Sequence, residues 1–154
     1  DVIAAAKAHA QADELDIKYQ ITSMEQLASQ HPNRWDVITC MEMLEHVPNP
    51  AEIITAIASA LKPGGWAFFS TINRTPKAFV QAIVGAEHIL KLIPKGTHHY
   101  EMLIQPAELA NWSRAVGLEV CSSRGIRYNP LFKRFSLTSS LSVNYLLAAR
   151  KHNV

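Results

Sequence analysis

Two short apolar runs on either side of an amphipathic helix constrain the fold of this chain most strongly. Residues 36–41 and 66–72 are apolar and rich in β-branched and aromatic types, and each has the length of a buried strand. The helix between them, residues 50–61, is followed by the turn sequence "KPGG". Its apolar residues recur at helical spacing: Ile53, Ile54, Ile57 and Leu61. Strands that are almost continuously apolar are typical of parallel sheets covered on both faces.

The rest of the chain continues this alternation. The pattern predicts helices over residues 1–13, 23–30, 76–93 and 105–116, and strands over residues 17–21, 118–126 and 143–150. Ser23 precedes the second helix as an N-cap residue. The expected fold is therefore an α/β domain with a mostly parallel sheet and helices on both faces.

Composition narrows the class of protein. The 154 residues fit one domain, and 48% of them are hydrophobic, enough for a core. A formal net charge of +2 is too balanced to indicate nucleic-acid binding. Cys40 and Cys121 match no metal or redox spacing and indicate a reducing compartment. The residues include no basic leader sequence and no apolar run of about 20 residues that would span a membrane.

A polar cluster follows the first of the two apolar runs. Glu42, Glu45 and His46 come directly after residues 36–41, and Thr71, Asn73 and Arg74 close the second run. In open α/β sheets, ligands bind outside the carboxyl ends of the strands. The cluster is therefore a candidate site. A solvated loop in which His46 caps the next helix explains the same spacing, and residue types alone leave the two interpretations about even.

Six sequence blocks, in order, identify the chain as a member of a known family. "TCMEMLEHV", "STINR", "VGAEHIL", "PKGTH", "GIRYNP" and "VNYLL" resemble segments of the ubiquinone biosynthesis O-methyltransferases, which are class I S-adenosylmethionine-dependent methyltransferases. The resemblance covers essentially the whole chain. It implies the class I fold for residues 1–154, with a family-type insertion over residues 74–104.

The same resemblance shows which family features the sequence lacks. Family members carry a glycine-rich loop after a first strand and an acidic residue after a second, and neither occurs in these residues. We therefore expect a partial methyltransferase domain without its N-terminal strands, corresponding to the C-terminal two-thirds of the enzyme. We expect this chain alone to bind the cofactor weakly or not at all.

The implied reaction is methylation of a ring hydroxyl on a polyprenylated phenol or catechol. A neutral phenol oxygen is a poor nucleophile, so a base or a cation must favour the phenolate. The resemblance implies that Glu42, Glu45 and His46 bind a divalent metal, Mg²⁺ in the first place, with Zn²⁺ or Mn²⁺ also compatible with an imidazole ligand. If the segment is helical, the three side chains share one face. His46 acting as a base without metal, with Glu45 beside it, is the competing mechanism.

Cofactor contacts are implied at two places. Met41, at the end of its strand, occupies a position that contacts S-adenosylmethionine in the family, although a methionine packed in the core fits the pattern equally well. Ser23 and Met24 follow the strand expected over residues 17–21, where class I enzymes line the adenine pocket. Helix capping by Ser23 explains its presence there as well.

Substrate and membrane contacts are expected in the later part of the chain. Lys95 and His98 lie in a Gly-containing loop that is either a lid or an ordinary surface loop. Tyr128 and Asn129 either touch the substrate ring or form a turn. The helix over residues 76–93 carries Phe79 and Ile83 and has basic residues near its ends, which suits a membrane interface, while packing in the core is the alternative.

Partners and location follow from the implied substrate. A polyprenylated ring resides in the bilayer, so we expect a cytoplasmic protein peripheral on the inner membrane, or on the mitochondrial matrix face in a eukaryote. Other proteins of ubiquinone biosynthesis are further expected partners, and nucleic acid is not. Two other functions stay open: a non-catalytic membrane-associated fragment, and a methyltransferase acting on carbon or on another small phenol.

Overall fold

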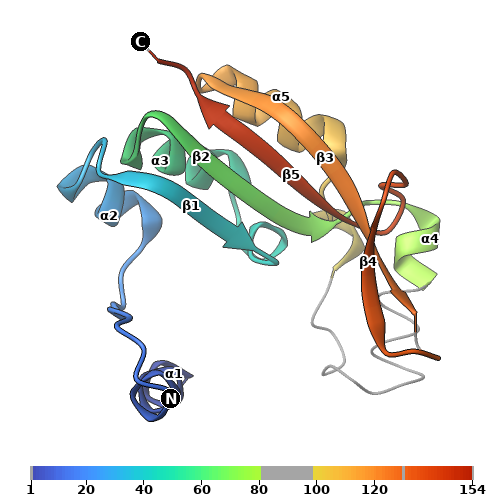
Figure 1. The fold of residues 1–154 in the computed structure, drawn as a ribbon. Coiled ribbons are helices and arrows are strands. Elements are labelled where there is room, and N and C mark those ends of the chain that lie inside the picture. Colours follow the sequence, from blue (N-terminus) through green and yellow to red (C-terminus); the bar gives the residue numbers. More distant parts are fainter. Residues whose placement is uncertain (1, 81–98, 130, 154) are drawn as a thin grey trace.

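The computed structural model describes residues 2–80, 99–129 and 131–153, and it shows one five-stranded sheet with helices (Figure 1). The strand order is β1-β2-β5-β3-β4. The strands are β1 (Trp35–Met41), β2 (Leu61–Ile72), β3 (Leu118–Asn129), β4 (Arg134–Thr138) and β5 (Asn144–Lys151). The α/β class predicted from the alternation of apolar runs and helices is confirmed.

The sheet is mixed rather than mostly parallel. β1 pairs with β2 in parallel, whereas β5 lies antiparallel between β2 and β3, and β4 is antiparallel to β3. It follows that β1, β2 and β3 run in one direction and that β4 and β5 run in the other. The carboxyl ends of β1, β2 and β3 therefore meet the amino ends of β4 and β5 at one edge of the sheet.

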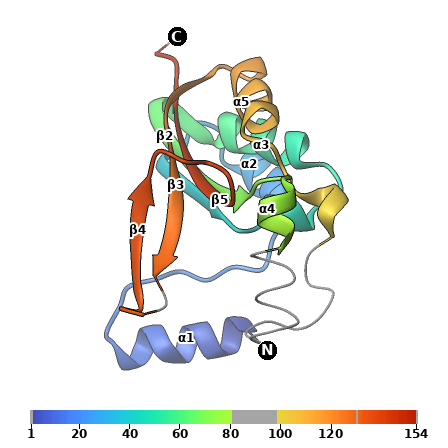
Figure 2. The same cartoon turned by 90° about the vertical axis from the view of Figure 1, so that its right-hand side faces the viewer.

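Helices cover one face of this sheet (Figure 2). The longer ones are α1 (Val2–Ala12), α2 (Met24–Gln30), α3 (Pro50–Ala60) and α5 (Pro106–Ala115). Short elements are the 3-10 turns η1 (Leu44–His46) and η3 (Tyr100–Met102) and the single turn α4 (Pro76–Ala78). α2, α3 and α5 lie on the covered face, whereas α1 lies apart from the sheet in both views.

The core lies between the sheet and α3 and α5. Phe69, Leu147 and Tyr145 project from β2 and β5 into a cluster that includes Ile54 and Leu109 from the helices. Burying each large apolar side chain contributes roughly 1.5–3 kcal/mol. The Tyr145 hydroxyl donates to the carbonyl oxygen of Ile104 at 3.0 Å, so this buried polar group is satisfied.

The opposite face of the sheet is open among the described residues. Val37 and Met41 of β1 and Phe68 of β2 are exposed there. Their neighbours in each strand alternate to the covered face, where Cys40, Ala67 and Phe69 are buried. The apolar residues on both sides of these strands predicted two covers, and the described helices supply one.

The structure confirms some of the helices and strands expected from the sequence and differs from others. Helices α2, α3 and α5 are confirmed within two residues at each end, and Ser23 is the N-cap of α2. Residues 17–21 form no strand, because no described strand lies beside them to pair with. Strand β4 was not predicted. The helix expected over 76–93 is described only at its start, α4, and residues 81–93 lie outside the described residues.

No described helix is long and apolar enough to cross a bilayer.

Candidate functional site at the strand ends

Glu42 takes the first position after β1 in a backbone conformation that is rare for its type. Its φ is 50°, in the left-handed region. The Glu42 N–H donates to both the carbonyl oxygen and the hydroxyl of Ser70 in β2, each at 3.0 Å. These bonds hold the turn in place, and such strained residues cluster at functional sites.

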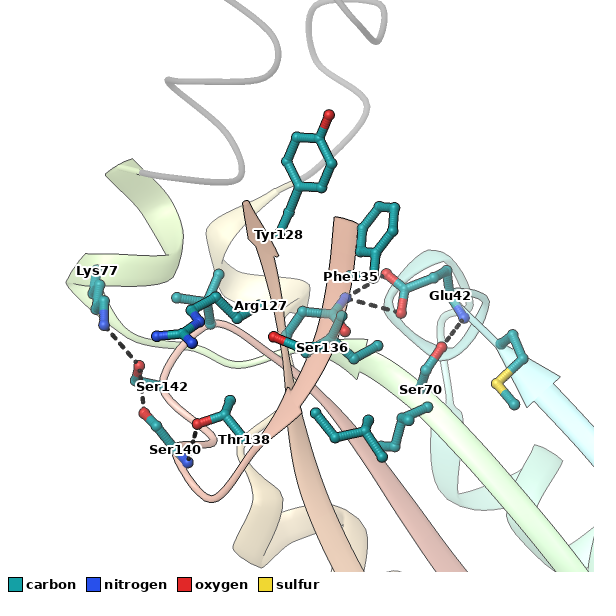
Figure 3. A pocket seen from close by; sticks show the side chains of 16 residues that line it. Glu42, Ser70, Lys77, Arg127, Tyr128, Phe135, Ser136, Thr138, Ser140 and Ser142 are labelled. Atoms are coloured by element: carbon teal, nitrogen blue, oxygen red, sulfur yellow. Dashed lines mark hydrogen bonds between the residues drawn. The ribbon is translucent and has the colours of Figure 1, made fainter. Parts of the chain in front are cut away.

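The Glu42 carboxylate is held by a residue from the neighbouring end of the sheet. The side-chain amide of Asn144, the first residue of β5, donates to both carboxylate oxygens at 3.1 Å (Figure 3). The oxygen of this amide, Asn144 Oδ1, is buried and has no hydrogen-bond partner in the part of the chain that the structure describes. The pair therefore ties the end of β1 to the start of β5 across 102 positions of sequence.

A cavity of about 1110 Å³ opens beside this pair, on the open face of the sheet. Its wall combines the strand-end residues with the β3–β4 hairpin and the segment before β5. Figure 3 shows Glu42, Ser70, Lys77, Arg127, Tyr128 and Phe135 around it. Apolar side chains form much of the lining: Met41, Ile126, Val143 and Leu146. The cavity is large enough for a drug-sized ligand with an apolar body and a polar group.

Glu45 is buried away from this cavity. It is 3% exposed and lies in η1. The Thr71 hydroxyl donates to Glu45 Oε2 at 2.9 Å, while Oε1 has no hydrogen-bond partner among the described residues. Burial raises the pKa of this carboxyl group above its ordinary value. Glu45 is thus a better proton acceptor than an exposed carboxylate.

His46 is exposed and follows Glu45 in η1. The expectation that Glu42, Glu45 and His46 share one helical face is wrong, because the helical turn begins at Leu44 and Glu42 has a left-handed backbone. Within the described residues, no three His, Cys, Asp or Glu side chains are grouped so that they would hold a metal ion. The donor set does not form a ready metal site, although the unpartnered oxygen of Glu45 is a ligand atom of the right kind.

The three residues expected to contact the cofactor differ in whether their side chains already have a structural role. Met41 is half exposed and lines the cavity next to Glu42. The Ser23 hydroxyl accepts the N–H of Gln26 at 3.1 Å, which is its capping role. Met24 packs against two clusters of the core. Met41 therefore fits S-adenosylmethionine best on position, and the other two have structural roles that account for them.

Three polar residues at the end of β2 turn out to hold the edge together. The Thr71 hydroxyl donates a hydrogen bond to Glu45, and the Asn73 amide donates to the Leu141 carbonyl oxygen at 2.8 Å. Arg74 forms an ion pair with Glu108 of α5. They lie beside the candidate site, as their position in the sequence predicts. Their described partners are protein groups, so they support its walls.

Of the residues expected to reach the substrate or a membrane, Tyr128 and Asn129 are at the end of β3. Tyr128 lines the cavity and its ring lies 4.8 Å from that of Phe135. The Asn129 side chain accepts the N–H groups of Leu131 and Phe132, so it forms the turn. Phe79 packs edge-on against Tyr100 and is partly exposed. Ile83, Lys95 and His98 lie outside the described residues.

Sequence reasoning missed Ser70, Phe135 and Asn144. Asn144 had no local signal, since its importance depends on β5 being inserted beside β2. Phe135 did have one, because "RFSLT" alternates polar and apolar residues as an exposed strand does.

Comparison with known proteins shows which family this chain resembles. Residues 3–123 match the family model described as a methyltransferase domain. The chain is 53% identical over 149 residues to the ubiquinone biosynthesis O-methyltransferase of Albidiferax ferrireducens and 50% identical over 146 residues to that of Bordetella pertussis. These alignments cover 96% and 95% of the chain but 59% and 61% of the relatives, so the chain spans about three-fifths of their length.

A solved structure gives the same fold. The S-adenosylmethionine-dependent methyltransferase from Methanosarcina mazei matches with a TM-score of 0.65 at 18% identity, over 97% of this chain and 77% of that one. An identity this low supports the fold alone. Together with the family model, which matches most of the sequence, the strand-end site and the mixed sheet lead to one conclusion: the chain belongs to the methyltransferase domain family.

Proposed function

We propose that the chain serves the transfer of a methyl group from S-adenosylmethionine to a ring hydroxyl of a polyprenylated phenol or catechol in ubiquinone biosynthesis. The observation that carries this proposal is the identity of 50–53% to relatives named for that activity, over nearly the whole chain. The cavity at the strand ends supports it, because Met41 and Glu42 line it next to apolar side chains from β3 and β5.

The chemistry requires a group that favours the phenolate over the neutral phenol. S-adenosylmethionine supplies the activated methyl group when bound. On the protein side, Glu45 has the raised pKa and the free oxygen expected of a proton acceptor, and the exposed imidazole of His46 follows it directly. We propose that Glu45 and His46 serve this step, as the family resemblance implies, although neither lines the cavity formed by the described residues, and that Met41 lies beside the cofactor.

A divalent metal, Mg²⁺ in the first place, is the finer part of the proposal. The unpartnered Glu45 oxygen and the family resemblance support it, but the described donors are not grouped for it. Chelation followed by re-addition of Mg²⁺ tests the metal separately from the reaction. Mg²⁺ is titrated into the chelator-treated wild type and Glu42→Gln in a calorimeter. Heat of binding supports a metal site, and no heat with either protein contradicts it.

The acceptor is expected to be largely apolar with one polar ring. The cavity combines aromatic and aliphatic walls with the Glu42 carboxylate at one side, which suits a hydroxylated ring carrying a prenyl tail. The proposed partners are the membrane surface, contacted by the helix expected over 76–93, and other proteins of ubiquinone biosynthesis. A peripheral location on the membrane is proposed with them.

The experiment is methyl transfer from labelled S-adenosylmethionine by a full-length protein that includes residues 1–154. Acceptors are a prenylated catechol, the same catechol without its tail, and a ring in which only a carbon position is free. We expect product on oxygen, identified by mass spectrometry and NMR, with preference for the prenylated acceptor. Product on carbon supports a different methyltransferase reaction, and no product with any acceptor supports a non-catalytic membrane-associated protein.

A further inference from the structure

The tip of the β3–β4 hairpin, here residues 127–129 and 131–137, exposes an unusual number of apolar side chains. Leu131 is 81% exposed and Phe132 is 67% exposed. Phe135 and Leu137 are also largely exposed, and Tyr128 is half exposed. Contiguous exposed apolar residues of this size mark a contact surface rather than ordinary protein surface.

The charges at the tip are all positive. Arg127, Lys133 and Arg134 are exposed, and the sequence contains no acidic residue after Glu119. Among the described residues, none of these three cations forms an ion pair with a carboxylate. Apolar and aromatic groups interspersed with unpaired cations complement a surface that is apolar below and negatively charged above, which is the structure of an anionic bilayer.

The tip is an ordered turn. The Asn129 side chain accepts the N–H groups of Leu131 at 3.1 Å and Phe132 at 3.3 Å. Lys133 follows with a φ of 49°, which reverses the chain into β4. In both views the hairpin projects beyond the rest of the sheet (Figures 1 and 2). Its apolar side chains are therefore presented at little further cost in ordering.

The same hairpin is a wall of the cavity. Arg127, Tyr128 and Phe135 line it together with Glu42 (Figure 3). The exposed rings thus continue from the outer surface into the candidate site. An apolar molecule that leaves a bilayer at the tip would meet the cavity without crossing water.

We propose that the β3–β4 hairpin tip binds an anionic lipid surface and holds the mouth of the cavity against it. The lipid contact is inferred from the residues of the tip alone, whereas its use for substrate entry rests on the proposed function. A second copy of the chain is the main rival occupant, since β4 is an edge strand. Parallel pairing through β4 would bring two positively charged tips together, which opposes that arrangement, and antiparallel pairing would point the two tips in opposite directions and leave them exposed.

Vesicle co-sedimentation of the purified chain tests the proposal without any catalytic step. The vesicles are phosphatidylcholine alone or phosphatidylcholine with phosphatidylglycerol, each at low and high salt. Leu131→Ser/Phe132→Ser removes apolar contact at residues that do not line the cavity. The matched control is Val2→Ser/Ile21→Ser, whose side chains are 84% and 80% exposed but lie outside the hairpin. Circular dichroism verifies that all variants keep their fold.

We expect wild type and the control to bind anionic vesicles, more weakly at high salt, and the Leu131/Phe132 variant to lose most of this binding. Lys133→Gln/Arg134→Gln should weaken the association by about fivefold for each cation removed. A third variant, Phe79→Ser/Val80→Ser, separates the hairpin from the segment after α4.

The proposal is overturned if both hairpin variants bind like wild type, whether or not the Phe79/Val80 variant does. It is also overturned if the wild type binds no vesicles, or if sedimentation velocity shows a dimer that the Leu131/Phe132 substitutions dissociate. Loss of lipid binding with unchanged methylation of an untailed catechol in the full-length protein supports the hairpin and leaves the proposed reaction intact. Absence of methylation with normal lipid binding contradicts the reaction alone.

Discussion

At the scale of single residues, Glu42 combines a left-handed backbone with a carboxylate fixed by Asn144. A non-glycine residue in this region carries about 1–2 kcal/mol of steric strain. Glu42→Gly and Glu42→Ala both remove the carboxylate, but only glycine relieves the strain. We predict that the glycine variant is more stable than the alanine variant by about 1 kcal/mol in urea unfolding. Equal stability would show that the turn is not strained.

The buried Glu45 carboxyl group gives a second prediction, on pH. Its ordinary pKa is 4.5, and burial raises the folded-state pKa above that value. Stability from this group is therefore fully present below pH 4.5 and is lost as the pH rises through the folded-state pKa, because the native state must then ionise a buried group. Glu45→Gln cannot ionise. We predict that its melting temperature gains on that of wild type as the pH rises from acid to neutral. A constant difference across this range would contradict the burial argument.

At the scale of elements, the helices were easier to predict from the sequence than the sheet. The periodicity of Ile53, Ile54 and Ile57 defines α3, and Ser23 marks the start of α2, since both signals are local. The strand expected over 17–21 shows the same kind of signal and still fails, because a strand needs a partner. The antiparallel insertion of β5 is also set by long-range pairing, which no local pattern encodes.

The candidate site divides in the same way. Its position after β1 was predictable, because the end of an apolar run is a local feature. The separation of Glu42 from Glu45 was not, since it depends on the left-handed turn at Glu42 and on the bond from Thr71 to Glu45.

The hairpin itself depends on Gly125. A Cβ atom there would lie 1.8 Å from the carbonyl oxygen of Ser140, a backbone atom that cannot turn aside. Gly117, by contrast, has a φ of 77° but open space around it. We predict that Gly125→Ala destabilises the chain by about 3 kcal/mol or more through overpacking, and Gly117→Ala by only about 1 kcal/mol through its backbone. Chemical unfolding of both variants measures this, and a Gly125→Ala variant as stable as Gly117→Ala would show that the 138–142 segment moves freely.

At the scale of the whole molecule, the question is how much of a cofactor site these residues form. None of the glycines forms the Gly-x-Gly loop that lets a backbone approach the cofactor, and Met41 is the described contact best placed for it. We predict that residues 1–154 alone bind S-adenosylmethionine weakly or not at all. Isothermal titration calorimetry on the isolated chain measures this. Micromolar affinity would mean that these residues form a complete cofactor site.

The polar cluster after β1 is proposed to carry out the chemistry of methyl transfer. Turnover of Glu45→Ala and His46→Ala in a full-length protein that includes this chain tests it most directly, with and without added Mg²⁺ and beside melting temperatures. We predict a fall in turnover of about 10²-fold or more in each variant, as for loss of a general acid–base group. The melting temperature of the His46 variant should hardly change, because surface substitutions usually cost little stability. Near-normal turnover in both variants would show that Glu45 and His46 have only a structural role.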